Sequence, residues 1–158
     1  MTKLRLRVNG TEHEAEIPDR TLLIHALRDH LRLTGSHLAC DTGQCGACTV
    51  HLDGKAVKSC LLLAAQAEGS EILTVEGLAS AEDTLHPMQE AFHREHGLQC
   101  GYCTPGMIMI AIDIVNRYRR PDAATVRAEL EGNLCRCTGY HNIVKAVVLG
   151  AELMETAA

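Results

Sequence analysis

Aromatic residues are scarce in this chain of 158 residues, which contains one Phe, three Tyr and no Trp. So few aromatic side chains give little material for base-stacking platforms or aromatic cages, which argues against the binding modules that depend on them. The 15 basic and 20 acidic residues give a net charge of −5 and form no long run of either sign. Because there is no basic stripe, we expect no nucleic-acid partner.

Long hydrophobic runs are missing as well. The first seven residues lack the apolar core of a signal peptide, and the longest apolar stretch, Met107 to Val115, is interrupted by Asp113. That stretch is too short to span a bilayer. We therefore expect no membrane insertion and a cytoplasmic location. The sequence also lacks a glycine-rich nucleotide motif and a convincing acid–base or nucleophile arrangement, so we expect no catalytic centre in this chain.

Cysteine, in contrast, is abundant, with eight residues in a short chain. Disulfides are rare in a reducing cytosol, where cysteine-dense small domains usually bind metal. A chain of this length has room for one domain or two small ones, and small domains benefit from such a staple. Disulfide pairing stays open as an alternative, because the count is even.

The first half of the chain carries strand signals. An Asn9-Gly10 pair between two alternating segments predicts a β-hairpin, and Asp19 or Thr21 is available to cap a following helix. The expected elements are strands over 3–8 and 13–17, a helix over 21–31, a glycine-rich loop over 35–48, a hairpin over 49–59 and a strand over 72–75.

From about Ala79 onward the pattern becomes helical, which predicts a boundary between a domain over residues 1–78 and a second over 79–158. Pro87 suits a first helical turn, and Asp122 suits an N-cap. We expect four helices, over about 87–97, from Pro105 through the apolar stretch, over 122–132 and over 141–154, forming a small bundle.

The first cysteine group is Cys40-x4-Cys45-x2-Cys48-x11-Cys60, and its opening has the plant-type ferredoxin spacing for a [2Fe–2S] cluster. Gly43, Gly46 and Ala47 provide small residues where a loop must approach a cluster closely. A Zn(Cys)4 site is the alternative, but zinc ribbons use two paired knuckles instead of a long glycine-bearing loop with a distant fourth cysteine.

The second group is Cys100-x2-Cys103-x31-Cys135-x1-Cys137, and this spacing suits zinc as well as iron. A cluster is favoured because both cysteine pairs come just before predicted helices, whose N-termini stabilise an anionic group. Neither group has the Cys-x-His pairs of a Rieske centre. The histidines are expected to be ordinary side chains, although His141 is next to the second group.

Three segments make the sequence resemble the iron–sulfur small subunit of the xanthine dehydrogenase family of molybdenum hydroxylases over nearly its whole length. They are the loop from Cys40 to Val50, the segment Gln99-Cys-Gly-Tyr-Cys-Thr-Pro-Gly106 and the segment Gly132-Asn-Leu-Cys-Arg-Cys-Thr-Gly-Tyr140. The segments 21–28 and 57–60 are particularly similar to the small chain of aerobic carbon monoxide dehydrogenases. Gly43-Gln44 departs from the Ser-His of those chains, so the substrate of the complex is left undetermined.

The resemblance implies an α+β fold, with a β-grasp plant-type ferredoxin domain followed by a four-helix-bundle [2Fe–2S] domain. It implies two [2Fe–2S] clusters here, and molybdopterin, as its cytosine dinucleotide, and FAD in partner subunits. In the family the helical-domain cluster lies closest to the pterin, so Gln99 is expected to contact the pterin and the Cys137 sulfur to lie near its amino group.

The implied function is relay of electrons from a molybdopterin site in a large subunit, through both clusters, to a medium FAD-binding subunit. The implied assembly is a heterotrimer that dimerises. A freestanding two-cluster ferredoxin is the alternative. Such shuttles are usually strongly acidic, whereas this chain has a modest charge and an apolar helical half, which suits a permanent subunit better.

Overall fold

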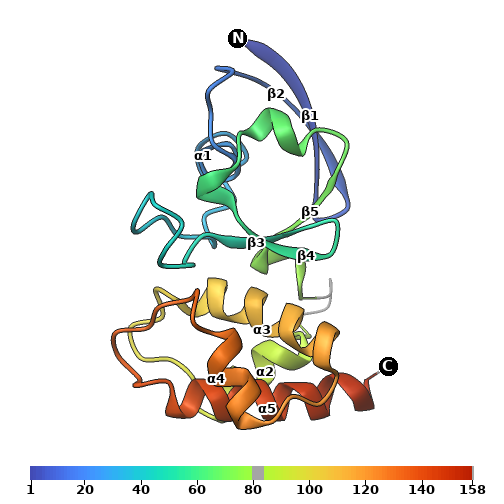
Figure 1. The fold of residues 1–158 in the computed structure, drawn as a ribbon. Coiled ribbons are helices and arrows are strands. Elements are labelled where there is room, and N and C mark those ends of the chain that lie inside the picture. The colour runs from blue at the N-terminus through green and yellow to red at the C-terminus, as the bar shows by residue number, and fades with distance from the viewer. Residues whose placement is uncertain (80–83, 158) are drawn as a thin grey trace.

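The computed structural model describes residues 1–79 and 84–157, and it places a β-sheet half above a helical half (Figure 1). The sheet half comprises the first part of the chain up to the short 3-10 turn Val75–Gly77, and the helical half begins at Pro87. The α+β class expected from the sequence is therefore what the structure shows.

A five-stranded mixed sheet forms the first half. Its spatial order is β2-β1-β5-β3-β4, in which only the β1–β5 pair is parallel. The expected Asn9-Gly10 turn joins the first two strands, and both of its residues have positive φ. The strands are β1 (Thr2–Val8), β2 (Thr11–Ile17), β3 (Thr49–Leu52), β4 (Lys55–Lys58) and β5 (Glu71–Leu73).

One face of this sheet is covered by α1 (Leu23–His25) and the π-helical turn Ala26–His30 that continues it. Every second residue of β1, namely Leu4, Leu6 and Val8, points to the same face of the sheet and is buried. These side chains pack against apolar residues of the helix and so form the core of this half. The predicted N-cap was wrong: Leu22 precedes the helix, and Asp19 instead accepts a hydrogen bond from the Thr2 hydroxyl.

Four helices form the second half: α2 (Pro87–Arg94), α3 (Thr104–Tyr118), α4 (Ala123–Glu129) and α5 (His141–Thr156). Pro87 occupies the first turn of α2, and the Asp122 carboxylate accepts from the Thr125 N–H at 2.8 Å as the N-cap of α4. The apolar stretch of α3 is buried, as the sequence predicts. The third helix was predicted too long, because it ends at Glu129 and leaves Gly132 in a loop.

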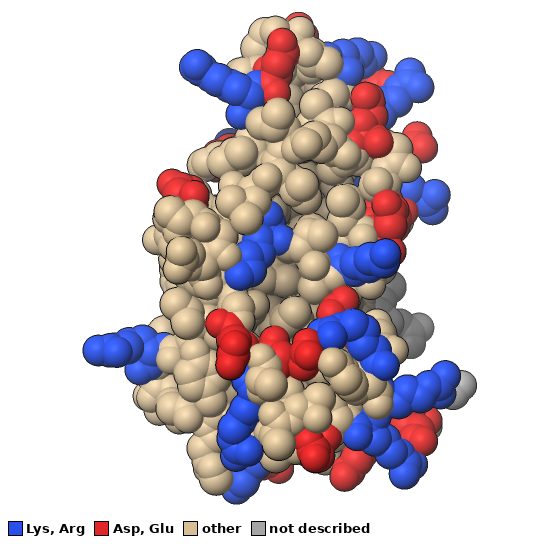
Figure 2. Space-filling model, in the orientation of Figure 1, with Lys and Arg blue, Asp and Glu red and all other residues tan. Residues whose placement is uncertain are grey.

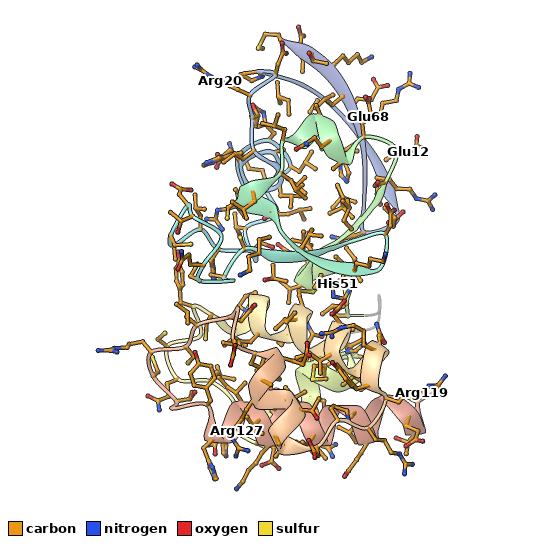
Figure 3. The ribbon with its side chains drawn as sticks, viewed as in Figure 1. Glu12, Arg20, His51, Glu68, Arg119 and Arg127 are labelled. Carbon is orange, nitrogen blue, oxygen red and sulfur yellow. The ribbon has the colours of Figure 1, made fainter. Side chains whose placement is uncertain are left out.

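The two halves meet where α3 lies against β3 and β4. His51 on β3 is 3% exposed and its Nε2 donates to the Met109 carbonyl of α3 at 2.8 Å, which places it at the boundary seen in Figure 3. The Asp113 carboxylate of α3 accepts from the Ala56 N–H of β4 at 3.1 Å. His51 is thus an ordinarily hydrogen-bonded histidine, as expected, but its bond joins the two halves.

Basic and acidic side chains are interspersed over the face that Figure 2 shows, in keeping with the mixed charge of the sequence. None of the helices in residues 1–79 and 84–157 combines the length and the hydrophobicity needed to cross a membrane.

Candidate metal centres

The first cysteine group is assembled from the loop before β3 and a 3-10 turn after β4. Cys40, Cys45 and Cys48 lie in the loop, and Cys60 lies in the turn Ser59–Leu61. The Ser59 N–H and hydroxyl both donate to the Cys48 carbonyl, at 3.3 and 2.7 Å, and so bring Cys60 back to the loop. Cys48 and Cys60 are buried together against Ile24.

Local hydrogen bonding and burial affect these thiols differently. Backbone N–H groups of Cys45 and Thr42 donate to the Cys40 sulfur and lower its pKa to about 6, the Cys45 N–H from 3.3 Å. Burial raises the pKa of Cys48 to about 11, and the neighbouring Cys60 thiol adds to the rise. A bound cation would offset the cost of holding a buried thiolate, so this environment suits a metal centre.

The second group is delivered by two loops that end in helices. Cys103 is the N-cap of α3, and Cys135 and Cys137 precede α5, as expected from the sequence. The Cys137 and Cys100 sulfurs lie 3.6 Å apart on the exposed side. On the inner side, burial and the neighbouring Cys135 and Cys100 thiols raise the pKa of Cys103 to about 12.

Tyr140 holds the loop that carries the second cysteine pair. It has a left-handed backbone (φ 66°) directly before α5, and its hydroxyl accepts from the Cys135 N–H at 2.9 Å while donating to the Asn133 carbonyl at 3.2 Å. The Cys135 sulfur lies 3.3 Å from the Thr138 hydroxyl. A side chain from the start of a helix therefore fixes the loop in front of it.

The donor set of each group fits a metal–sulfur cluster. All eight cysteines are free thiols in the structure, so the disulfide alternative is not supported. Two thiolates on one tetrahedral metal lie about 3.8 Å apart, close to the Cys100–Cys137 separation of 3.6 Å. Across residues 1–79 and 84–157, no three Cys, His, Asp or Glu side chains converge tightly enough to hold a single ion.

Gln99 and His141 lie at the surface. Gln99 precedes Cys100 and is exposed, and Cys137, whose sulfur lies 3.6 Å from that of Cys100, is exposed too. His141 is exposed at the start of α5. The exposed positions leave Gln99 and Cys137 accessible to another molecule.

The two cysteine loops touch directly. The Leu134 N–H donates to the Cys45 carbonyl at 2.8 Å, which joins the residue before Cys135 to a member of the first group. The rings of His37 and Tyr102 stack with centroids 4.4 Å apart, and the Tyr102 hydroxyl donates to the Leu38 carbonyl at 2.8 Å. Sequence patterns gave no role to these contacts, because each joins residues more than 60 positions apart.

Two family models match the two halves: "2Fe-2S iron-sulfur cluster binding domain" over residues 6–79 and "[2Fe-2S] binding domain" over residues 74–148. The chain is 49% identical to caffeine dehydrogenase subunit gamma of Pseudomonas sp. (strain CBB1), over 98% of this chain and 93% of that protein. It is 47% identical to the nicotine 6-hydroxylase small subunit of Paenarthrobacter nicotinovorans, over 92% and 87%. This chain is an iron–sulfur small subunit of the xanthine dehydrogenase family of molybdenum hydroxylases.

A solved structure agrees with this family assignment. The small subunit superposes on quinoline 2-oxidoreductase from Pseudomonas putida 86 with a TM-score of 0.93 and 41% identity, covering 98% of this chain and 96% of that chain. The predicted fold, a plant-type ferredoxin domain followed by a helical [2Fe–2S] domain, is thereby confirmed.

Proposed function

We propose that this small subunit carries two [2Fe–2S] clusters and passes electrons from a molybdopterin site in a large partner subunit to a flavin subunit. The observation that carries the proposal is that eight free cysteines lie close together in pairs, two pairs in each half that a [2Fe–2S] model matches. Each cluster, when bound, accepts and releases one electron at a time.

The ligand assignment follows the two groups. The first cluster would be held within residues 1–78 and the second within residues 79–158, and the family matches ending at 79 and starting at 74 support this division. The proposed ligands are Cys40, Cys45, Cys48 and Cys60 for the first cluster, and Cys100, Cys103, Cys135 and Cys137 for the second.

The second group would face the pterin. Gln99 is exposed beside Cys100, and the exposed Cys137 sulfur is 3.6 Å from that of Cys100, so both can meet a partner without rearrangement of the loops. Gln99 would hydrogen-bond to the pterin through its amide, and Cys137 would present the sulfur closest to it.

The chain would work as a permanent subunit. The relatives are named as a subunit gamma and a small subunit, which favours this role over a freestanding ferredoxin. We propose a cytoplasmic heterotrimer with a large molybdopterin-binding subunit, carrying the cytosine dinucleotide form, and a medium FAD-binding subunit, and two such trimers pairing as a dimer.

The test is purification of the tagged chain with its partners under anaerobic conditions, followed by metal analysis and EPR after dithionite reduction. We expect about four iron and four labile sulfide per chain and two distinct [2Fe–2S] signals, with molybdenum in the same complex. Zinc in place of iron would refute the cluster assignment. Two clusters without a molybdenum-containing partner would support the freestanding ferredoxin instead.

A further inference from the structure

One buried side-chain amide joins the loops of both cysteine groups. Asn133 is 3% exposed, and its Nδ2 donates to the Gly46 carbonyl at 3.1 Å, to the Gly106 carbonyl at 3.1 Å and to the Thr49 hydroxyl at 3.3 Å. Gly46 lies in the first cysteine loop and Thr49 begins β3 directly after it, whereas Gly106 lies in the first turn of α3. Three segments far apart in the sequence therefore converge on a single nitrogen.

The chemistry of these partners requires a hydrogen-bond donor at this position. Both carbonyl oxygens can only accept, so the group facing them must donate, and an NH2 group offers two hydrogens to share among the three acceptors. The Thr49 hydroxyl also donates to the Gly46 carbonyl at 2.7 Å, which adds a fourth hydrogen bond to the three that Asn133 makes. In a buried site, replacing the donor by an acceptor would set several oxygens against one another.

The backbones around Asn133 are as close as glycine permits. A Cβ on Gly46, which has φ +71°, would lie 2.5 Å from Asn133 Oδ1 and 2.6 Å from the Gly132 carbonyl. A Cβ on Gly106 would collide with the Gly46 carbonyl and approach Ala47 Cα to 3.1 Å. We call the place where Gly46, Gly106 and Asn133 meet the Asn133 junction. The distance between the loops at this junction is set by direct contact of their backbones.

Every member of the junction lies within three residues of a cysteine in the sequence. Gly46 follows Cys45, Gly106 comes three residues after Cys103, and Asn133 comes two residues before Cys135. The next residue, Leu134, donates its N–H to the Cys45 carbonyl at 2.8 Å. A movement at Asn133 would therefore shift the two cysteine groups relative to each other without removing any thiol.

We infer that Asn133 is a positioning residue for electron transfer between the two clusters: its buried amide, held at once by the first cysteine loop and the start of α3, fixes the distance between the two cysteine groups. This inference rests on the proposed two-cluster function. Electron transfer rates fall steeply with the gap between donor and acceptor, so a junction that keeps the loops in contact controls the rate.

The test compares Asn133→Asp with Asn142→Asp in the purified complex. Aspartate keeps the shape of asparagine but loses the NH2 donors, so at position 133 an acceptor would face three oxygen atoms. Asn142→Asp is the control for the same chemical change. The Asn142 Nδ2 donates at 3.4 Å to the His96 carbonyl, an exposed bond between two residues of the helical half that does not reach the first cysteine loop. Lys58→Met is a milder second variant, since it removes only the Lys58 Nζ bond to the Gly132 carbonyl at 2.8 Å on the exposed side of the junction.

Iron content and EPR of the fully reduced complex separate the possible outcomes. We expect unchanged iron in all variants, reduced magnetic interaction between the two signals in Asn133→Asp, a smaller reduction in Lys58→Met, and none in Asn142→Asp. Rapid-freeze EPR should also show slower arrival of electrons at the outer cluster in Asn133→Asp.

If Asn133→Asp does not fold, Lys58→Met alone decides, and an interaction equal to wild type overturns the inference. Wild-type interaction in a folded Asn133→Asp, or the absence of any interaction in the wild type, overturns it too. Fewer than two clusters in the wild type would instead refute the proposed function.

Discussion

Single cysteines should report on single clusters, because close thiol pairs join cysteines of the same group. Cys48 is buried against Cys60, and Cys103 against Cys135. We expect Cys103→Ser to remove one of the two EPR signals and about half of the iron, and the matched variant Cys48→Ser to remove the other signal. Loss of both signals in either variant would show that the two groups do not hold independent centres.

Gln99 should affect electron entry without affecting the clusters. In the complex, Gln99→Ala removes a side chain that is exposed beside Cys100, so we expect full iron content, both EPR signals and slower reduction of the clusters by substrate. The control is Gln44→Ala, which changes another exposed glutamine that directly precedes a cysteine, on the first loop. Unchanged kinetics in Gln99→Ala, or an equal slowing in both variants, would remove the role proposed for Gln99.

At the level of elements, the contact between the first cysteine loop and the loop that carries Gly132 and Asn133 should be sensitive to one methyl group. Gly46 and Gly54 both have positive φ, but a Cβ on Gly46 would meet Asn133 whereas a Cβ on Gly54 would meet nothing within 4 Å. We expect Gly54→Ala to destabilise the fold by about 1–2 kcal/mol through backbone strain, and Gly46→Ala by about 1–3 kcal/mol more through crowding.

Denaturant unfolding of the two variants, monitored by circular dichroism under anaerobic conditions, measures this difference. Equal destabilisation by both substitutions would mean that the loop moves to accept the methyl group with no loss of unfolding free energy. The close approach at Gly46 would then have no importance for stability.

Elements with a clear local pattern were predictable from the sequence, and those set by distant partners were not. The alternation of Leu4, Leu6 and Val8 and the cap at Asp122 are local signals, and both were confirmed. The cap of α1 was mistaken because Leu22 instead bridges to Leu63, 41 positions away, and the end of α4 was mistaken because no local residue forces it.

The same limit applies to the candidate site. Cysteine spacing and the family resemblance singled out two groups of four, and in the structure each group consists of two close pairs of thiols. The assignment of the eight cysteines as cluster ligands stays a prediction. The role of Gly46 was anticipated only in part: the neighbour that requires its small size in the structure is Asn133, 87 positions away. Asn133 belonged to the segment 132–140 that carries the family resemblance, but no sequence pattern assigned it a role of its own. Its three acceptors lie far away in the chain, so no local pattern indicates them.

For the molecule as a whole, the cysteine loops should depend on bound metal more than the sheet and the helices do. The segments around Cys45 and Cys137 have no strand or helix of their own, whereas each half has its own apolar core. Removing iron with a chelator under reducing conditions should therefore lower the midpoint of thermal unfolding and accelerate hydrogen exchange first in these loops. Exchange that rises equally in β1 and α5 would contradict this order.

The junction at Asn133 has a consequence for inheritance and engineering. Its parts come from both halves of the chain, with Gly46 in one half and Gly106 and Asn133 in the other. A chimera that takes its ferredoxin half from a distant relative would succeed only if that half also brings a glycine at position 46 and the neighbouring backbone shape. Each half resembles an independent domain. We nevertheless expect substitutions at the contact in one half to be accompanied by substitutions in the other, and chimeras of halves from distant relatives to fold poorly.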